Sequence, residues 1–260
     1  MNTVKEIALF FTLAFALILG ACSGDTTKTE EKEPAQEVTL TVFAAASLKS
    51  TFTELAKEFE AENEGVTVAL NFDGSSNLVA QIQDGAPADV FASSDVNNMT
   101  KAEDAKLVEG KSVLFATNIL QIATPPDNPA GIKSFADLAK PGVKLVICAE
   151  PVPCGSATAQ VAKNAGVTLS PVSEEQNVTD VLGKVRSGEA DAGLVYVTDV
   201  ISAGDDVHGI VFPEASSVVN EYPIAALSNS KHKDLASAFV TFMTSAKAQS
   251  VFKAAGFGQP

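Results

Sequence analysis

The chain is poor in the side chains that usually hold charged or metallic groups. Its 260 residues include one arginine, Arg186, two histidines and three cysteines. A recognition scheme built on arginine clamps therefore has at most one clamp to use, and we interpret Arg186 itself as solvated. The histidines and cysteines are too few and too scattered for a structural zinc site, and we expect His208 and His232 at the surface.

Positive charge is also scarce overall. Lysine and arginine total 18 against 32 aspartate and glutamate residues, which gives a formal net charge of −14. This balance argues against a nucleic-acid partner and against charge-driven binding to an anionic membrane. With 46% hydrophobic and 19% charged residues, the composition is typical of a globular protein. The length allows one large domain or two lobes, and no repeat of 20 to 50 residues is visible.

The N-terminus predicts an exported protein. Lys5 precedes an apolar run, Ile7–Leu19, that is too short to span a membrane comfortably and is typical of a signal peptide, residues 1–21. The run ends in the letters LGAC, which resemble the lipobox of bacterial lipoproteins and imply a lipid on the sulfur of Cys22. An ordinary secretory signal with an incidental cysteine is the alternative. Residues 22–37 lack apolar periodicity and predict a flexible tether, so we expect a membrane-anchored protein in the periplasm or at the outer cell surface.

The other two cysteines, Cys148 and Cys154, stand six residues apart in VICAEPVPCG. In an oxidising compartment, a disulfide between them would join a strand end to the following loop. Two buried thiols that never meet are the alternative.

Strand and helix patterns alternate along almost the whole chain. Residues 38–42 and 66–72 alternate apolar and polar side chains, as strands do, and Leu48, Phe52, Leu55 and Phe59 follow helical spacing. The pattern predicts an α/β fold with largely parallel sheets.

Four strand-to-helix junctions carry small or polar residues, at Ser47, Ser75, Cys154 and Val178. The start of a helix presents unsatisfied N–H groups and the positive end of the helix dipole, which together attract anions. In open α/β sheets, ligands bind beyond the carboxyl ends of the strands, where such junctions lie. A serine that merely caps its own helix is the commoner role at any single junction.

Six segments in this order resemble the molybdate-binding proteins of ABC importers: VFAAASL, FDGSSNL, APADVFASSD, VPCG, NVTDVL and GLVYVTD. The resemblance runs from about Val38 to Phe257. It implies a two-lobed, type II periplasmic-binding-protein fold that holds molybdate or tungstate in the cleft between the lobes. We expect lobe 1 at residues 38–117 and 225–260, and lobe 2 at residues 118–224.

The resemblance also implies a site made of neutral donors. These are the hydroxyl and backbone N–H groups of Ser47 and Ser75, the backbone N–H groups of Cys154 and Val178, and the hydroxyl of Tyr196. Whether Ser75 or Ser76 supplies the hydroxyl stays open, and Tyr196 could instead be a core aromatic. We expect no cofactor and no directly coordinated metal.

The sequence therefore predicts a lipid-anchored, monomeric receptor that delivers molybdate or tungstate to an ABC importer permease. A receptor for another tetrahedral oxyanion, such as sulfate, is the alternative. We do not expect an enzyme, because the sequence has no G-x-S-x-G elbow, no histidine beside a nucleophile motif and no metal-ligand cluster.

Overall fold

The computed structural model describes residues 37–260 of the chain. The predicted signal peptide, Cys22 and the predicted tether up to residue 36 lie outside the described residues. Within residues 37–260, no helix is long and apolar enough to cross a membrane.

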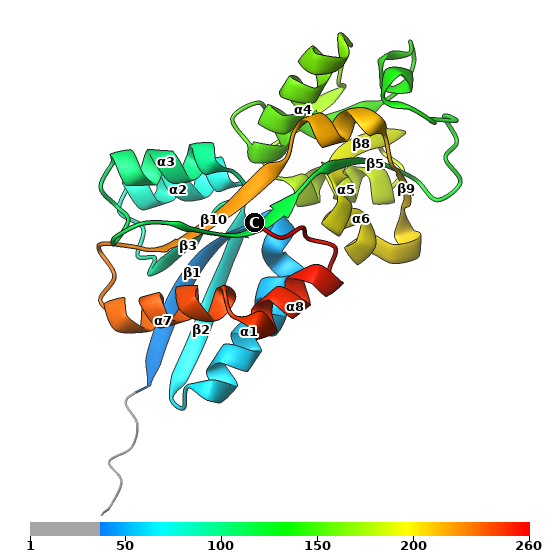
Figure 1. Ribbon diagram of the computed structural model, residues 1–260. Helices are drawn as coiled ribbons and strands as arrows, with labels where there is room; N and C mark the ends of the chain where they lie inside the picture. Colours follow the sequence, from blue (N-terminus) through cyan, green and yellow to red (C-terminus); the bar gives the residue numbers. More distant parts are fainter. Residues whose placement is uncertain (1–36) are drawn as a thin grey trace, which may run out of the picture. The chain divides into compact units, whose positions relative to one another are not determined.

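Two five-stranded sheets form the framework (Figure 1). The first sheet has the strand order β2-β1-β3-β10-β4 and contains β1 (Val38–Ala45), β2 (Val66–Asp73), β3 (Val90–Ala92), β4 (Val113–Asn118) and β10 (Asn220–Ala226). β1 pairs in parallel with β2 and β3, whereas β10 runs antiparallel to β3 and β4.

The second sheet has the order β7-β6-β8-β5-β9 and contains β5 (Leu120–Thr124), β6 (Leu145–Cys148), β7 (Ser173–Glu175), β8 (Ala192–Tyr196) and β9 (His208–Ile210). β6 pairs in parallel with β7 and β8, and β5 runs antiparallel to β8 and β9. The α/β class is confirmed, but the sheets are mixed rather than largely parallel. The reason is that β5 and β10 follow segments in which the chain passes from one sheet to the other, so no β-α-β crossover sets their direction.

Helices cover both faces of the first sheet (Figure 1). One buried cluster joins Val42 and Ala44 to α1 (Lys49–Glu62), α7 (Lys233–Met243) and α8 (Ala246–Ala254). Phe43, which points to the opposite face, packs with α2 (Ser75–Gln83) and α3 (Val96–Asp104). The four residues that predicted the first helix, Leu48, Phe52, Leu55 and Phe59, are all at most 3% exposed.

A separate buried cluster surrounds the second sheet. It includes side chains of α4 (Pro153–Ala165), α5 (Val178–Arg186) and the short α6 (Val197–Ala203) region. The remaining helical turns are η1 (Ala46–Leu48), η2 (Phe135–Ala139), η3 (Gly204–Asp206) and η4 (Pro213–Ser217). β4 and β5 follow each other closely along the chain but belong to different sheets, and β7 lies between α4 and α5.

The chain passes from the first sheet to the second between Asn118 and Leu120, and it returns to the first sheet before Asn220. The two-lobed organisation follows from these two sheets and their separate cores. The exact lobe boundaries at 117/118 and 224/225 stay a prediction, and β10 already belongs to the first sheet from Asn220 onward.

Candidate functional site

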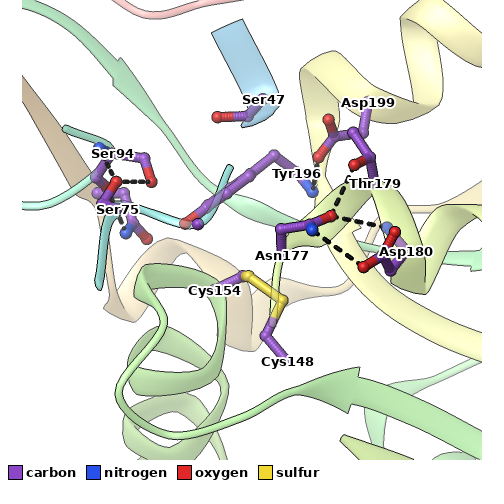
Figure 2. The surroundings of a disulfide bond; sticks show 12 residues. Ser47, Ser75, Ser94, Cys148, Cys154, Asn177, Thr179, Asp180, Tyr196 and Asp199 are labelled. Carbon is purple, nitrogen blue, oxygen red and sulfur yellow. Dashed lines mark hydrogen bonds between the residues drawn. A yellow bond between two sulfur atoms is a disulfide. The ribbon is translucent and has the colours of Figure 1, made fainter. Parts of the chain in front are cut away.

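The predicted donor residues lie at or beside the starts of helices. Ser47 lies in η1, immediately before α1, and Ser75 is the first residue of α2. Cys154 is the second residue of α4, and Val178 is the first residue of α5. Figure 2 shows Ser47, Ser75 and Cys154 on separate elements around the Tyr196 side chain.

The helices differ in how their N-termini are capped. α2 begins after Gly74 and α4 after Val152, and neither start has a side-chain cap. Asn177 caps α5, but it accepts the N–H of Asp180 rather than that of Val178. Backbone N–H groups in these first turns are therefore left for another acceptor, which is the requirement of an anion site.

The hydroxyl of Ser47 is held by a distant tyrosine. Its Oγ lies 3.0 Å from the hydroxyl of Tyr222, a residue 175 positions away in the sequence. The alanines before Ser47 are buried, and Ala44, Ala45 and Ala46 are each at most 6% exposed. Their small side chains leave the backbone at this strand end accessible to a close neighbour.

Ser75, rather than Ser76, is buried at the site. The Ser75 side chain is 0% exposed, whereas Ser76 is half-buried. The Oγ of Ser75 accepts the backbone N–H of Ser94 at 3.0 Å, and the two hydroxyl oxygens lie 3.3 Å apart. These contacts place the Ser75 hydroxyl in a fixed position at the start of α2.

The Tyr196 hydroxyl is the most informative atom of the site. Tyr196 is 1% exposed, and its hydroxyl has no hydrogen-bond partner among the described residues. Leaving a buried hydroxyl unpaired costs about 1–3 kcal/mol, so a partner from outside the chain is expected there. Burial raises the pKa of Tyr196 well above its usual value; the nearby Tyr222, Asp95 and Asp199 add to the rise, and the neighbouring Ser94 side chain opposes it. The hydroxyl therefore keeps its proton and acts as a donor.

Two buried carboxyl groups lie near this tyrosine. The Asp199 carboxylate accepts the backbone N–H of Tyr196 at 2.9 Å, and burial raises the pKa of Asp199 to about 7 despite this bond. Burial also raises the pKa of Asp95, although hydrogen bonds from Asn98 and Ser93 oppose the rise. Both groups therefore hold a proton more tightly than a free aspartate.

The structure forms the disulfide between Cys148 and Cys154 (Figure 2). The S–S distance is 1.98 Å and the Cα–Cα distance is 5.6 Å, and both residues are buried. At the next position, Gly155, an added Cβ would lie 1.9 Å from the carbonyl oxygen of Ala149. The start of α4 is thus fixed closely against the end of β6, together with the backbone N–H of Cys154.

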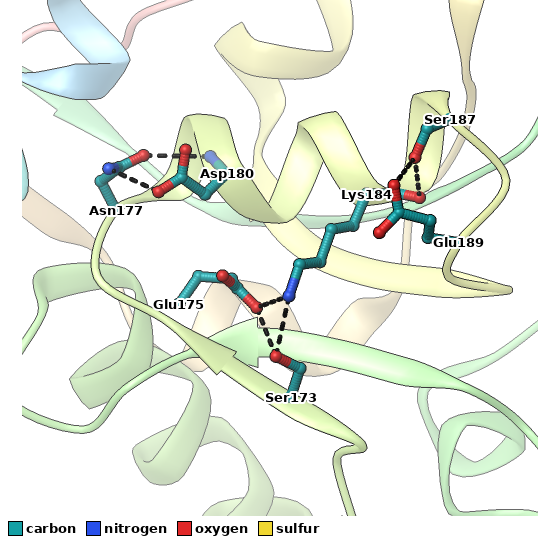
Figure 3. Close-up of polar contacts among 7 residues, drawn as sticks. All are labelled: Ser173, Glu175, Asn177, Asp180, Lys184, Ser187 and Glu189. Carbon is teal, nitrogen blue, oxygen red and sulfur yellow. Dashed lines mark hydrogen bonds and ion pairs between the residues drawn. The ribbon is translucent and has the colours of Figure 1, made fainter.

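The segment before Val178 is fixed by polar contacts (Figure 3). Lys184 of α5 pairs with Glu175 of β7 and donates to the hydroxyl of Ser173 at 2.9 Å. Burial alone would raise the pKa of Glu175, but the bonds from Lys184 and Ser173 lower it below its usual value. Asn177 caps the helix and also bonds to the Asp180 side chain at 2.9 Å. These contacts hold β7 and the start of α5 together.

The starts of α2 and α5 touch each other. The Nδ2 atom of Asn177 donates to Asp73 at 3.4 Å. A Cβ added at Gly74 would lie 2.1 Å from the carbonyl oxygen of Gln176, so the two backbones approach as closely as glycine permits. The segment that leads into Ser75, on the first sheet, therefore contacts the segment that leads into Val178, on the second sheet.

Three residues of this region were missed by the sequence reasoning: Ser94, Asn118 and Tyr222. Ser94 stands within the quoted APADVFASSD segment, which was the only available signal for it. Asn118 and Tyr222 lie in β4 and β10, the strands next to the segments that pass between the sheets, and their contact joins positions 104 residues apart. No local pattern could indicate that pairing.

The cavity of about 600 Å³ beside this region contains Ser47, Lys49 and Arg186 but none of the other four predicted donors. Arg186 is half-exposed and pairs with Asp206, and His208 is exposed, as expected. Within residues 37–260, no three histidine, cysteine, aspartate or glutamate side chains are grouped so that they could hold a metal ion.

Comparison with known proteins gives consistent matches over the whole described region. A family model described as bacterial extracellular solute-binding protein matches residues 40–258. The molybdate-binding protein ModA of Mycobacterium tuberculosis is 45% identical over 261 residues, covering 99% of this chain and 100% of the relative. A sulfate-binding protein of Synechococcus elongatus is 24% identical and covers 94% of this chain and 79% of that protein.

Among solved structures, the periplasmic molybdate-binding protein of Azotobacter vinelandii superposes with a TM-score of 0.73 at 24% identity. The match covers 85% of this chain and 99% of that chain, and it bears out the two-lobed α/β fold. The matching proteins are solute-binding proteins rather than enzymes.

Proposed function

Because the chain belongs to the bacterial extracellular solute-binding protein family, we propose that it is the molybdate or tungstate receptor of an ABC importer. The observation that carries this proposal is the buried Tyr196 hydroxyl, which has no partner among the described residues. It lies in a region where the starts of several helices supply further donors. A tetrahedral dianion supplies the acceptors that this hydroxyl and these N–H groups lack.

The donor set suits a dianion because every member is neutral. With a net charge of −14, the protein cannot attract an anion through its overall field and needs short-range, oriented dipoles instead. The start of each helix contributes about half a positive charge. Hydrogen bonds to a charged acceptor contribute about 1.5–3 kcal/mol each, so a handful of them gives tight binding after ordering costs.

We assign the ligand contacts to Ser47, Ser75, Cys154, Val178 and Tyr196. Ser47 and Tyr196 contribute hydroxyls from opposite sides of the site, and the buried Ser75, not Ser76, contributes the third. Cys154 and Val178 contribute backbone N–H groups, so their side chains do not contact the anion.

A sulfate receptor is the second candidate, because sulfate carries the same charge and shape and a sulfate-binding protein is among the relatives. The higher identity to the mycobacterial molybdate-binding protein favours molybdate. A thermal-shift panel of molybdate, tungstate, sulfate and phosphate separates the two. We expect molybdate and tungstate to raise the melting temperature most, since a ligand at 100 times its Kd stabilises by about 2.7 kcal/mol. A shift with sulfate alone would select the second candidate, and no shift with any oxyanion would reject the proposal.

We further propose that the mature protein is lipidated at Cys22 and delivers its ligand to a membrane permease as a monomer. The LGAC segment and the polar stretch after it support the anchor. Closure of the two lobes around the anion would create the surface that the permease recognises. Cys22→Ser should move the protein from the membrane fraction to the soluble exported fraction. Retention of this variant in the membrane fraction would contradict lipidation at this residue.

A further inference from the structure

Tyr222 lies where the segments that pass between the two sheets meet the proposed site. Its side chain is completely buried, and its ring packs edge-on against the rings of Phe115, Tyr196 and Phe257, with centroid distances of 6.3, 6.1 and 5.5 Å. Its hydroxyl is hydrogen-bonded to Asn118 Nδ2 at 3.4 Å and to Ser47 Oγ at 3.0 Å, and the Tyr196 hydroxyl lies nearby. The directions of these two bonds decide what Ser47 can offer a ligand.

The direction of the first bond follows from the orientation of the Asn118 amide. Its Oδ1 accepts the backbone N–H of Ile119 at 3.0 Å. Its Nδ2 therefore faces the other way, where it donates to Thr198 Oγ1 at 2.8 Å and to the Tyr222 hydroxyl oxygen. An amide nitrogen has only protons to give, so Tyr222 must be the acceptor of this bond.

The second bond, between Tyr222 and Ser47, can run in either direction, because each hydroxyl has one proton and two lone pairs. Burial raises the pKa of Tyr222 well above its usual range, so the phenol keeps its single proton. Its oxygen already accepts from Asn118, and the direction that leaves the Ser47 proton for a ligand is the one in which Tyr222 donates to the Oγ of Ser47. Ser47 then accepts from Tyr222 and has its own proton free for a ligand.

We propose that Asn118 and Tyr222 are positioning residues that fix the Ser47 hydroxyl as a proton donor to the bound dianion. This inference rests on the proposed function of the site. Neither residue contacts the ligand in this scheme; each acts by directing the hydrogen bond of the next. Because Asn118 ends β4 and Tyr222 lies near the start of β10, the chain of bonds joins the two strands that adjoin the segments passing between the sheets.

Ser75 shows the same arrangement independently. Its Oγ accepts the backbone N–H of Ser94 at 3.0 Å, so that oxygen is also occupied by a protein donor. When Ser75 donates to the ligand rather than to Ser94 Oγ, 3.3 Å away, both serine hydroxyls offer their protons to the anion. The site should favour fully deprotonated tetrahedral dianions over hydrogen phosphate, whose own proton needs an acceptor.

A double-mutant cycle tests the chain of bonds. Molybdate binding is measured by calorimetry for wild type, Ser47→Ala, Tyr222→Phe and the double variant. Tyr222→Phe alone should weaken binding by about 3- to 10-fold, because Ser47 is then free to point its proton elsewhere. In the Ser47→Ala background the same change should cost less than about 2-fold. A matched cycle of Tyr222→Phe with Ser75→Ala should be additive, since the two residues do not act through each other.

The selectivity for molybdate over phosphate is a second measurement, and it would not change if Tyr222 had only a structural role. Tyr222→Phe should narrow the preference for molybdate over phosphate, because a free Ser47 hydroxyl can accept the phosphate proton. Phenylalanine keeps the ring packing, and the melting temperature of the ligand-free variant checks this. If Tyr222→Phe does not fold, Asn118→Ala replaces it in the same cycle. Asn118→Ala should weaken molybdate binding in wild type but have little effect on it in the Ser47→Ala background.

The outcomes separate this inference from the proposed function. If wild type binds molybdate or another oxyanion and the Ser47 cycle is additive, or Tyr222→Phe leaves affinity and selectivity unchanged, the positioning role is wrong while the receptor function stands. If wild type binds no molybdate, tungstate, sulfate or phosphate, both fail.

Discussion

The two sides of the proposed site hold their donors in different ways. On the side of the first sheet, Ser47 and Ser75 present hydroxyls that are already bonded to protein neighbours. On the side of the second sheet, Cys154 and Val178 present backbone N–H groups at helix starts, and Tyr196 presents a hydroxyl that has no partner within residues 37–260.

This difference shows how each side is made rigid before a ligand arrives. The Ser47 hydroxyl is hydrogen-bonded to the Tyr222 hydroxyl, and the Ser75 hydroxyl accepts the backbone N–H of Ser94. A disulfide and a capping asparagine fix the backbone donors instead. Side-chain substitutions can remove donors on the first side, whereas on the second side only Tyr196 can be removed in this way. The following changes are ordered from the largest expected effect to the smallest.

Gly74→Ala should force apart the backbones of the two sides of the site. The new Cβ would lie 2.1 Å from the carbonyl oxygen of Gln176, so the backbone donors of the second side could not reach an anion held by the first. Losing two or more charge-assisted bonds predicts a loss of molybdate affinity of about 100-fold or more by calorimetry.

Gly183→Ala is the matched control for that change. Gly183 lies within α5, and an added Cβ there meets no atom within 4 Å. This variant should bind as wild type does and should gain slightly in stability, because alanine favours helix over glycine by about 1 kcal/mol. Equal affinity of Gly74→Ala and wild type would contradict the required closeness of the two sides.

Tyr196→Phe should remove the one side-chain donor of the second side. The loss of a bond to a charged ligand predicts about 10- to 100-fold weaker molybdate binding. The ligand-free protein should be equally or more stable, since the variant deletes a buried hydroxyl that lacks a partner among the described residues. Chemical denaturation of the ligand-free protein measures this second effect, and a clear loss of stability would show that the hydroxyl is paired in solution.

Replacing Cys148 and Cys154 together by serine should test the covalent support of the second side. Closing a loop of this length is expected to stabilise the folded protein by about 2 kcal/mol, and denaturation of the double variant should show that deficit. Molybdate affinity should fall less than in Tyr196→Phe, because the backbone N–H of Cys154 is retained. An affinity loss larger than that of Tyr196→Phe would mean that the disulfide, rather than the helix start, sets this donor.

On the second side, the raised pKa of Asp199 predicts that the stability of the folded protein depends on pH. Its pKa rises from 3.8 to about 7 on folding, so the native state binds a proton more tightly than the unfolded chain between these values. The resulting stability is full below about pH 4 and is lost as the pH rises through about 7. Relative to Asp199→Asn, wild type should lose about 2 kcal/mol between pH 5 and pH 7. A difference between the two proteins that stays constant over this range would contradict the raised pKa.

Ser75→Ala and Ser76→Ala form the sharpest pair on the first side. Ser75 is buried and bonded to Ser94, whereas Ser76 is half-buried. Ser75→Ala should weaken molybdate binding by about 10-fold, and Ser76→Ala should change it by less than about 2-fold. The reverse order would assign the hydroxyl contact to Ser76.

Local pattern was enough to predict much of the fold. The spacing of Leu48, Phe52, Leu55 and Phe59 encodes which face of α1 is buried, because one turn of helix fixes that face. Strand direction was not encoded in this way. β10 pairs with β3 and β4, which lie more than 100 residues earlier, and its antiparallel direction depends on how the chain returns from the second sheet.

The residues of the site likewise divide into those that local sequence predicts and those that depend on distant contacts. Ser47, Ser75, Cys154 and Val178 stand at strand-to-helix junctions that the sequence displays directly. The unpaired state of the Tyr196 hydroxyl is a property of the packed interior, and the bond between Ser47 and Tyr222 spans 175 residues. Neither feature can be predicted from a short stretch of sequence, because both depend on which distant side chains come into contact after folding.

The central claim is that donors from both sides surround one dianion at Tyr196. A crystal of the protein grown with molybdate, measured by the anomalous scattering of molybdenum, tests this directly. We expect one molybdenum peak with its oxygens within hydrogen-bond distance of the Ser47, Ser75 and Tyr196 hydroxyls and of the backbone N–H groups of Cys154 and Val178. A peak confined to the cavity beside Lys49 and Arg186, with Tyr196 still unpaired, would contradict the claim.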